Sequence, residues 1–266
     1  MVDAGAGVDA TTVELHTADG VRLQGRWLLA PGAADASVVL VHGFSASQSD
    51  VGVCALARDL AGSGYDVLTY DARGHGESEG WCGVGSTEHR DVACAVEAAL
   101  LHGKPVVLVG VSMGGVAVAG YLAEQRVSAP GAPAGAVLVS TPSRWRMRVS
   151  PVGLLTALLT RTRLGRFVAS HRLRVRISPD WRVGEPLEAL VERITLPLAV
   201  VHGTGDRLLA QEHGRRLHAS AAGPSRLELV EGMGHGIDVP SLAATVGAVG
   251  WVLSAARGAP TTRPDR

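Results

Sequence analysis

The residues with the clearest chemical potential lie in a glycine-flanked turn, Gly110-Val111-Ser112-Met113-Gly114. An apolar run rich in β-branched residues precedes it at 105–109, and a segment typical of a helix follows at 115–124. A serine on a sharp strand-to-helix turn is held in a strained backbone conformation that exposes its hydroxyl beyond the sheet. Glycines two positions before and after it leave room for strand and helix to approach closely. Ser112 is therefore a candidate nucleophile.

A serine nucleophile needs an adjacent base, which is itself oriented by a third group. Among ten histidines, His235 is best placed, because it follows a predicted strand and stands between two glycines. His213 and His218 fall on a predicted surface helix. His42 and His202 lie beside glycines at strand ends, where an imidazole more often bonds the backbone. We predict that His235 is the general base.

The orienting acid is predicted to be Asp206, which ends the segment His-Gly-Thr-Gly-Asp after another predicted strand. It lies between Ser112 and His235 in the chain. Asp238 is close to His235 but is expected to cap the last helix. Asp180 lies in a segment without strands and is a weaker candidate.

An oxyanion formed by attack of Ser112 needs preorganised donors. The backbone N–H of Met113, at the start of a helix, is predicted to supply one, since helix-end polarity favours negative charge there. The N–H of Phe44 is predicted to supply the other, from the sharp turn that follows the strand ending at Val41. This chemistry requires neither a metal nor an organic cofactor.

The chain reads as a series of short strands and amphipathic segments. A hairpin with the turn Asp19-Gly20 comes first, and strands then alternate with helices, which include 51–61 and 87–101. This order predicts an α/β fold with a mostly parallel central sheet, helices on both faces and an N-terminal antiparallel hairpin. The predicted strands are 12–16, 21–29, 37–41, 65–70, 106–109, 136–140, 196–201 and 226–230.

Four loops of interest start at the carboxyl ends of predicted strands, after Val41, Val109, Val201 and Val230. Ligands of such sheets bind beyond those ends. The loops are therefore expected to converge on one rim although they are far apart in the sequence.

One segment, 143–194, interrupts the alternation with helical pieces and no clear strand. It is too long for an ordinary connection and is predicted to be a helical cap inserted between two late strands. The core would then comprise 1–142 and 195–257 as one discontinuous domain, followed by a disordered tail at 258–266.

The cap segment contains eleven arginines and four acidic residues, on a chain whose formal net charge is zero. This composition fits a solvated basic face. It also fits a cap that attracts an anionic substrate, such as a phospholipid headgroup or a coenzyme A thioester, while its leucines cover an acyl chain. Leu155 and Leu158 in the cap, and Trp81 in a loop before it, are candidate substrate-binding residues.

The whole chain sets further bounds. Its 266 residues, 46% of them hydrophobic, can bury a sizeable core. The neutral charge predicts no nucleic-acid partner. Three cysteines, no secretory signal and no apolar run approaching the roughly 20 residues that span a bilayer lead us to expect a cytoplasmic protein. The oligomeric state stays open.

Five motifs occur in a specific order, and together they resemble the α/β-hydrolase superfamily. The chain resembles in particular its soluble serine esterase and lysophospholipase-like, serine aminopeptidase-type branch, over about 12–142 and 195–255. The resemblance implies Ser112, Asp206 and His235 as a triad, with Phe44 and Met113 as oxyanion donors. The motifs are His42-Gly43-Phe44, Asp71-Ala72-Arg73-Gly74-His75-Gly76-Glu77-Ser78, the turn around Ser112, His202-Gly203-Thr204-Gly205-Asp206 and Gly234-His235-Gly236.

The expected function is hydrolysis of carboxylic esters, lipid-like or acyl, through an acyl-enzyme intermediate. An acyl thioesterase or acyltransferase that uses the same intermediate is the alternative. Rivals from other classes are a non-catalytic binding module that retains the fold and an adaptor that works through the basic cap. The expected partner is a small acyl ester or thioester, with at most transient membrane-surface contact through the cap.

Overall fold

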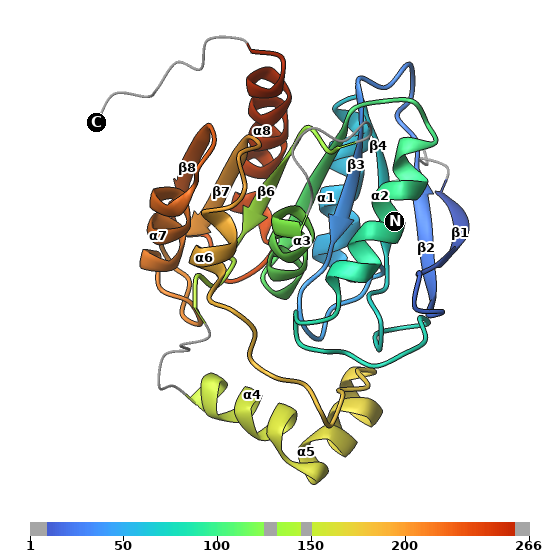
Figure 1. Ribbon diagram of the computed structural model, residues 1–266, viewed down its shortest axis with the longest axis vertical. Coiled ribbons are helices and arrows are strands. Elements are labelled where there is room, and N and C mark those ends of the chain that lie inside the picture. Colours follow the sequence, from blue (N-terminus) through green and yellow to red (C-terminus); the bar gives the residue numbers. More distant parts are fainter. Residues whose placement is uncertain (1–9, 125–131, 145–150, 259–266) are drawn as a thin grey trace, which may run out of the picture.

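A single eight-stranded sheet organises the computed structural model, which describes residues 10–124, 132–144 and 151–258. The strands follow the spatial order β1-β2-β4-β3-β5-β6-β7-β8 (Figure 1). Their bounds are Ala10–His16 (β1), Arg22–Leu28 (β2), Ala36–Val41 (β3), Tyr65–Tyr70 (β4), Val106–Val111 (β5), Gly135–Val139 (β6), Leu198–Gly203 (β7) and Ser225–Val230 (β8).

The sheet is antiparallel at one edge and parallel elsewhere, which confirms the predicted fold class. β1 pairs with β2, and β2 with β4, in antiparallel register. All other pairs, from β4 through β3 to β8, are parallel. Every residue of β3 and of β5 is buried, as expected for strands covered on both faces.

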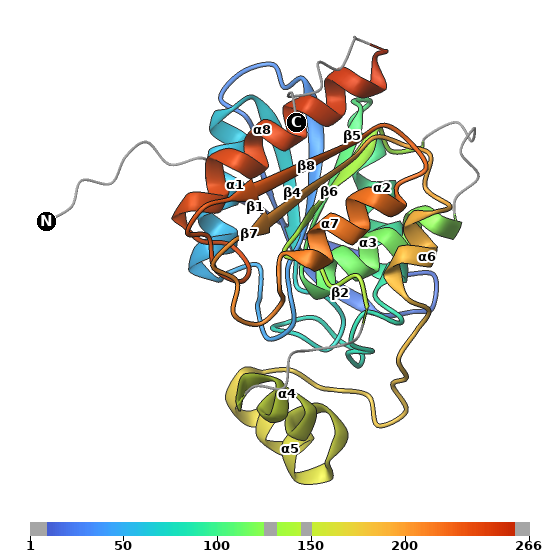
Figure 2. The ribbon, with the colours of Figure 1, turned by 90° about the vertical axis from the view of Figure 1, so that its left-hand side faces the viewer.

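Helices cover both faces of the sheet (Figure 2). α1 (Val51–Gly62) and α8 (Val239–Ala256) lie on one face, where their apolar residues pack in a common core with β3, β5 and β6. α2 (His89–Leu100), α3 (Met113–Glu124), α6 (Leu187–Val191) and α7 (Glu212–Ser220) lie on the other, over a second core.

α8 corrects one expectation from the sequence. With 18 residues and a mean hydropathy of 1.5, it is, among the described helices, the one long and apolar enough to cross a membrane. Its side chains at Ala248, Val249, Val252 and Leu253 are instead buried in the core shared with the sheet. Ser241, Thr245, Ser254 and two glycines interrupt the apolar residues of α8, so the sequence shows no continuous apolar run of this length.

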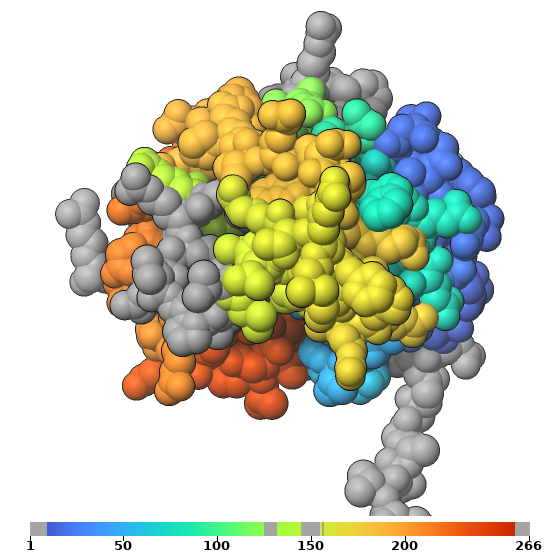
Figure 3. Space-filling view, turned by 90° about the horizontal axis from the view of Figure 1, so that it is seen from below, coloured from blue at the N-terminus to red at the C-terminus, as the bar shows by residue number. Residues whose placement is uncertain are grey.

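The connection from β6 to β7 carries helices that lie away from the sheet. α4 (Pro151–Arg161), α5 (Arg163–Val168) and the short π-helix η1 (Ala169–Leu173) form a group below the rest of the molecule in Figure 1. We call these three elements the cap helices. Seen from below, they lie over the middle of that face (Figure 3). α6, by contrast, packs against α3 and α7. The cap boundaries 143 and 194 stay a prediction, and the tail beyond Gly258 lies outside the described residues.

The chain leaving the cap helices is fastened to the loop that follows β4. Arg176 N–H donates to Gly74 O over 2.7 Å, and Cys82 N–H donates back to Arg176 O over 2.7 Å. The guanidinium of Arg176 also donates to the carbonyls of Ser78 and Gly80. The motif at 71–78 therefore supports the cap through backbone groups.

Gly74 tests this attachment. It has a φ of +75°, and an added Cβ would lie 2.7 Å from Arg176 O and still closer to Cys82 N. We expect Gly74→Ala to lower the free energy of unfolding by about 1–3 kcal/mol, because strain and overlap add. Urea denaturation measures this, with proteolysis of the cap as a second readout.

Gly62→Ala, at the end of α1, is the matched control, since no atom lies within 4 Å of its added Cβ. It should leave the stability unchanged or slightly raised. Equal stability of the Gly74 variant and this control would contradict the proposed attachment.

Candidate active site

Ser112 occupies the turn between β5 and α3 in a strained conformation. Its φ is +51°, a value that L-residues rarely adopt. Glycines flank it because of packing: an added Cβ on Gly110 would lie 2.6 Å from Gly115 Cα, and one on Gly114 would overlap Val41 O. The strand, the helix and the neighbouring β3 thus meet so closely that the turn has to be sharp.

The structure brings together three side chains that are far apart in the sequence. His235 Nε2 lies 3.0 Å from Ser112 Oγ, and His235 Nδ1 lies 2.8 Å from Asp206 Oδ2. A carboxylate can only accept, so Nδ1 carries the proton and Nε2 is left to accept from the Ser112 hydroxyl. The order serine, imidazole, carboxylate is that of a catalytic triad.

The Asp206 carboxylate is fully buried and held by more than the imidazole. The backbone N–H groups of Leu208 and Leu209 each donate to its Oδ1 over 2.8 Å, and His202 Nε2 lies 3.6 Å from its Oδ2. Burial alone would raise the pKa of Asp206, but the hydrogen bonds to His235 and to these N–H groups hold it below its ordinary value. The group is therefore a fixed negative charge at neutral pH.

The loops that carry Asp206 and His235 support each other. Gly205 N–H donates to Met233 O over 3.0 Å. Asp238, predicted to cap the last helix, does so: its side chain accepts from Ser241 N–H in a capping box. It also accepts from Gly234 N–H over 2.7 Å. The Asp238 side chain, which caps α8, thus also fixes the position of the loop directly before His235.

The two predicted oxyanion donors lie on either side of the turn that carries Ser112. Met113 is the first residue of α3, so its N–H has no partner within the helix. Phe44 follows Gly43, whose added Cβ would lie 3.4 Å from Ser112 Cβ. The turn after β3 therefore runs against Ser112.

A pocket of about 220 Å³ opens beside Ser112 and His235. The sequence did not single out the residues that form its far wall on α1 and beyond His235, among them Val53 and Ile237. The available signal for Val53 was its position in the first turn of a predicted helix. The signal for Ile237 was its position two residues after His235. The full lining is Gly43, Phe44, Ala46, Asp50, Gly52, Val53, Val111, Ser112, His235, Gly236 and Ile237.

The three predicted substrate-binding side chains do not line this pocket. Trp81 is 60% exposed, Leu155 57% and Leu158 51%. They lie on the surface of the cap helices and of the loop at 80–84. Their contact with substrate stays a prediction.

The remaining histidines at strand ends have structural partners. His42 Nε2 accepts from Ala72 N–H over 2.9 Å, and its Nδ1 lies 2.8 Å from Gly43 O. His202 Nε2 lies 3.2 Å from Leu209 O. His42 therefore joins the ends of β3 and β4. Within the described ranges, no group of three or more His, Cys, Asp or Glu side chains is arranged to hold a metal ion.

Comparison with known proteins agrees with this geometry. The family model described as serine aminopeptidase, S33, matches residues 32–188. Human monoglyceride lipase is 30% identical, over 83% of this chain and 82% of that protein. An esterase from Rhodococcus sp. ECU1013 is 25% identical with a TM-score of 0.67, covering 91% of this chain and 98% of that one. A Pyrococcus furiosus esterase, 22% identical with a TM-score of 0.69 over 97% and 96%, shares the fold.

The fold and the arrangement around Ser112 define an α/β-hydrolase. The chain belongs to the serine aminopeptidase S33 family within that class. It is a hydrolase of the esterase and lipase group.

The buried Asp206 predicts a specific pH dependence. Its folded-state pKa lies below the ordinary value of 3.8, so the stability it contributes is fully present above that value and is lost as the pH falls through the folded-state pKa. Asp206→Asn removes this contribution. The difference in free energy of unfolding between wild type and variant should therefore shrink from about pH 5 to about pH 2.

Urea titrations at a series of pH values measure this difference. Asp59→Asn, at an exposed position on α1, serves as the control. A wild-type advantage over Asp206→Asn that stays constant across the whole series would contradict the assignment.

Proposed function

We propose that the protein is a serine esterase that cleaves carboxylic esters through an acyl-enzyme, with Ser112 as nucleophile, His235 as general base and Asp206 as orienting acid. The observation that carries the proposal is the continuous hydrogen-bonded chain from Ser112 Oγ through both ring nitrogens of His235 to Asp206. Membership of the family and likeness to a monoglyceride lipase support it.

In the first half of the reaction, Ser112 Oγ attacks the ester carbonyl carbon while its proton passes to His235 Nε2. The negative charge that forms on the carbonyl oxygen is stabilised by the N–H groups of Met113 and Phe44. The carbon–oxygen bond to the alcohol then breaks. The alcohol oxygen takes the proton from Nε2, and the acyl group stays on Ser112.

In the second half, His235 takes a proton from water, whose oxygen attacks the acyl carbon. The bond to Ser112 Oγ breaks, the serine recovers its proton from Nε2, and the carboxylic acid leaves. The Asp206 charge stabilises the imidazolium in both halves. The strained turn and the capped loop before His235 keep the three groups within hydrogen-bonding distance, so little reorganisation is needed.

The pocket beside Ser112 is the proposed site of the acyl chain. Val53, Val111 and Ile237 give it an apolar wall, as an aliphatic chain requires. A monoglyceride lipase as relative favours lipid-like acyl esters as the substrate class.

A fluorophosphonate probe tests the nucleophile. The wild type should react covalently in stoichiometric amount and lose all esterase activity. Ser112→Ala should not react and should lose activity by about 10³-fold or more, because no other group can form the acyl-enzyme. Intact-protein mass spectrometry and p-nitrophenyl ester hydrolysis measure the two effects.

Ser63→Ala, at the exposed end of α1, is the control and should behave as wild type. An unlabelled but folded wild type would favour a non-catalytic binding role instead.

Val53→Phe tests the acyl pocket. Val53 is 4% exposed and lines it, so a larger ring there should shorten the space for the chain. We expect kcat/KM for p-nitrophenyl octanoate to fall about tenfold or more relative to the acetate, since a clash opposes binding of the longer chain.

Val51→Phe provides the matched control, because this residue of the same helix is 87% exposed and lies outside the pocket. An unchanged ratio of octanoate to acetate in the Val53 variant would place the acyl chain elsewhere.

A further inference from the structure

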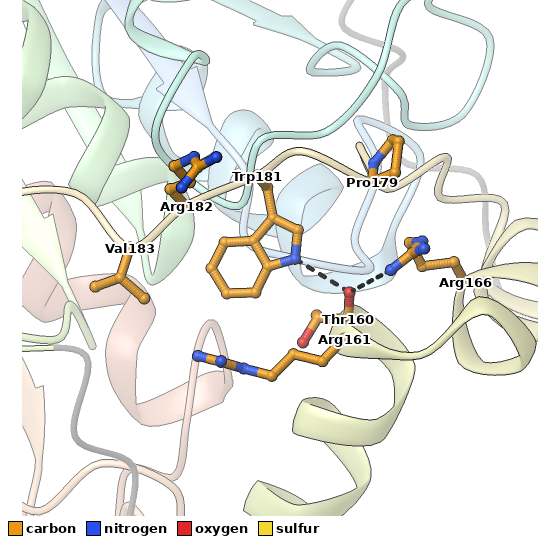
Figure 4. A pocket seen from close by; sticks show the side chains of 7 residues that line it. All are labelled: Thr160, Arg161, Arg166, Pro179, Trp181, Arg182 and Val183. Carbon is orange, nitrogen blue, oxygen red and sulfur yellow. Dashed lines mark hydrogen bonds between the residues drawn. The ribbon is translucent and has the colours of Figure 1, made fainter.

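A second hollow, separate from the pocket of Ser112, lies between the cap helices and the chain that returns from them. Its volume is about 540 Å³, which is within the range of small-molecule sites. We call it the arginine hollow (Figure 4). It is lined by Thr160, Arg161, Arg166, Pro179, Trp181, Arg182 and Val183.

The charges of the hollow are of one sign. Three of its lining residues are arginines, and none is acidic. Within the part of the chain that the structure describes, Arg161, Arg166 and Arg182 form no ion pair with a carboxylate. Residues 151–183 contain seven arginines and one acidic residue, Asp180, which is exposed and does not line the hollow.

Specific contacts fix the wall of the hollow. Trp181 Nε1 donates to Thr160 O over 3.1 Å, and Arg166 Nη1 donates to the same carbonyl over 3.5 Å. The guanidinium carbon of Arg161 lies 5.5 Å from the centroid of the Trp181 ring. Figure 4 shows the side chains of Arg161 and Arg182 on two sides of this ring. Arg161 therefore lies over a fixed aromatic ring, and among the described residues most N–H donors of these three arginines have no protein acceptor.

The hollow is linked to the proposed catalytic centre through an apolar cluster that Trp181 contacts. This residue packs against a small apolar cluster that contains Met113, and Phe44 packs against the same cluster. Phe44 also lines the pocket of Ser112. One apolar layer thus joins the wall of the hollow to both proposed oxyanion residues.

We propose that the arginine hollow binds a phosphate group. Guanidinium groups match phosphate oxygens in geometry, and three positive charges suit a group of −1.5 to −2 better than a single carboxylate. The apolar edge formed by Trp181, Pro179 and Val183 would contact carbon atoms attached to the phosphate. The phosphate belongs either to a lysophospholipid-like substrate, in which case the inference rests on the proposed esterase activity, or to a free phosphate ion.

A binding experiment tests the site without turnover. Ser112→Ala protein is titrated calorimetrically with glycerol 3-phosphate, with glycerol as the neutral reference. Saturable binding of glycerol 3-phosphate alone is expected. It should weaken about tenfold or more when Arg161, Arg166 and Arg182 are all changed to Gln, since charge-assisted hydrogen bonds are lost.

The matched control changes three exposed cap arginines outside the hollow, Arg163, Arg172 and Arg174, to Gln. It removes the same charge and should weaken binding by less than about threefold, because screening limits the attraction at a distance. Equal weakening in both triple variants, or no saturable binding to the parent protein, overturns the proposal. Thermal unfolding of both variants verifies that each is folded.

Kinetics then separate the two sources of phosphate. The active enzyme is compared on lysophosphatidic acid and on the monoacylglycerol with the same acyl chain, both short enough to stay monomeric. If the substrate carries the phosphate, the hollow variant raises KM for lysophosphatidic acid about tenfold with kcat retained, and leaves monoacylglycerol unchanged. If a free ion binds, inorganic phosphate binds as tightly as glycerol 3-phosphate and alters monoacylglycerol turnover without competing with it.

Equal loss on both substrates would assign these arginines to folding of the cap and would overturn the site. A wild type that hydrolyses neither these two substrates nor p-nitrophenyl esters would contradict the proposed esterase function. The calorimetric titration would still decide whether phosphate binds.

Discussion

The positive φ of Ser112 is the constraint on which the rest of the structure depends. A serine accepts this conformation only where its surroundings leave no alternative. Here the surroundings are the close contacts of Gly110 with α3 and of Gly114 with the end of β3. The same close packing brings the turn after β3 against the serine. The first N–H of α3 has no helical partner because it opens the helix. The proposed nucleophile and the turn that carries Phe44 are thus positioned by one packing arrangement, and a change that relaxed it would alter both together.

The parallel sheet explains how Asp206 and His235 reach this serine. β5, β7 and β8 have the same direction, so the loops that follow them start from the same edge. Proximity alone does not give a working geometry. The carboxylate is held by two backbone N–H groups, and the loop before the imidazole is held by Asp238. The donors in these contacts are main-chain N–H groups, so the orientation of the proposed triad depends on the path of the chain and on the Asp238 carboxylate that holds it.

The sequence predicts the parts of the site that follow local rules. Ser112, Asp206 and His235 each stand directly after a predicted strand, and glycines mark the turns, so type and position together indicate them. The strands, the hairpin and the cap on α8 also follow from local pattern. The far wall of the pocket does not, because Val53 and Ile237 meet only when α1 and the loop after β8 are packed. The arginine hollow is likewise nonlocal. Charge counting finds a basic segment, but not that Arg161 lies over the Trp181 ring and that Arg166 and Trp181 donate to the same carbonyl.

The neutral net charge of the chain conceals a separation of charge. Two acidic residues of the core are bound to basic partners, Asp19 to Arg73 and Asp66 to Lys104. The arginines of the hollow lack such partners in the described structure, so their like charges repel one another. Trp181 and the apolar cluster that it contacts offset that repulsion by burial.

An anion bound among the arginines would relieve this repulsion directly, so ligand binding and the stability of the cap helices are coupled through the same charges. Because guanidinium groups stay protonated at every physiological pH, this coupling is independent of the proton transfers at His235. Recognition and chemistry then rest on separate groups, joined by the one apolar layer between Trp181 and the oxyanion turn.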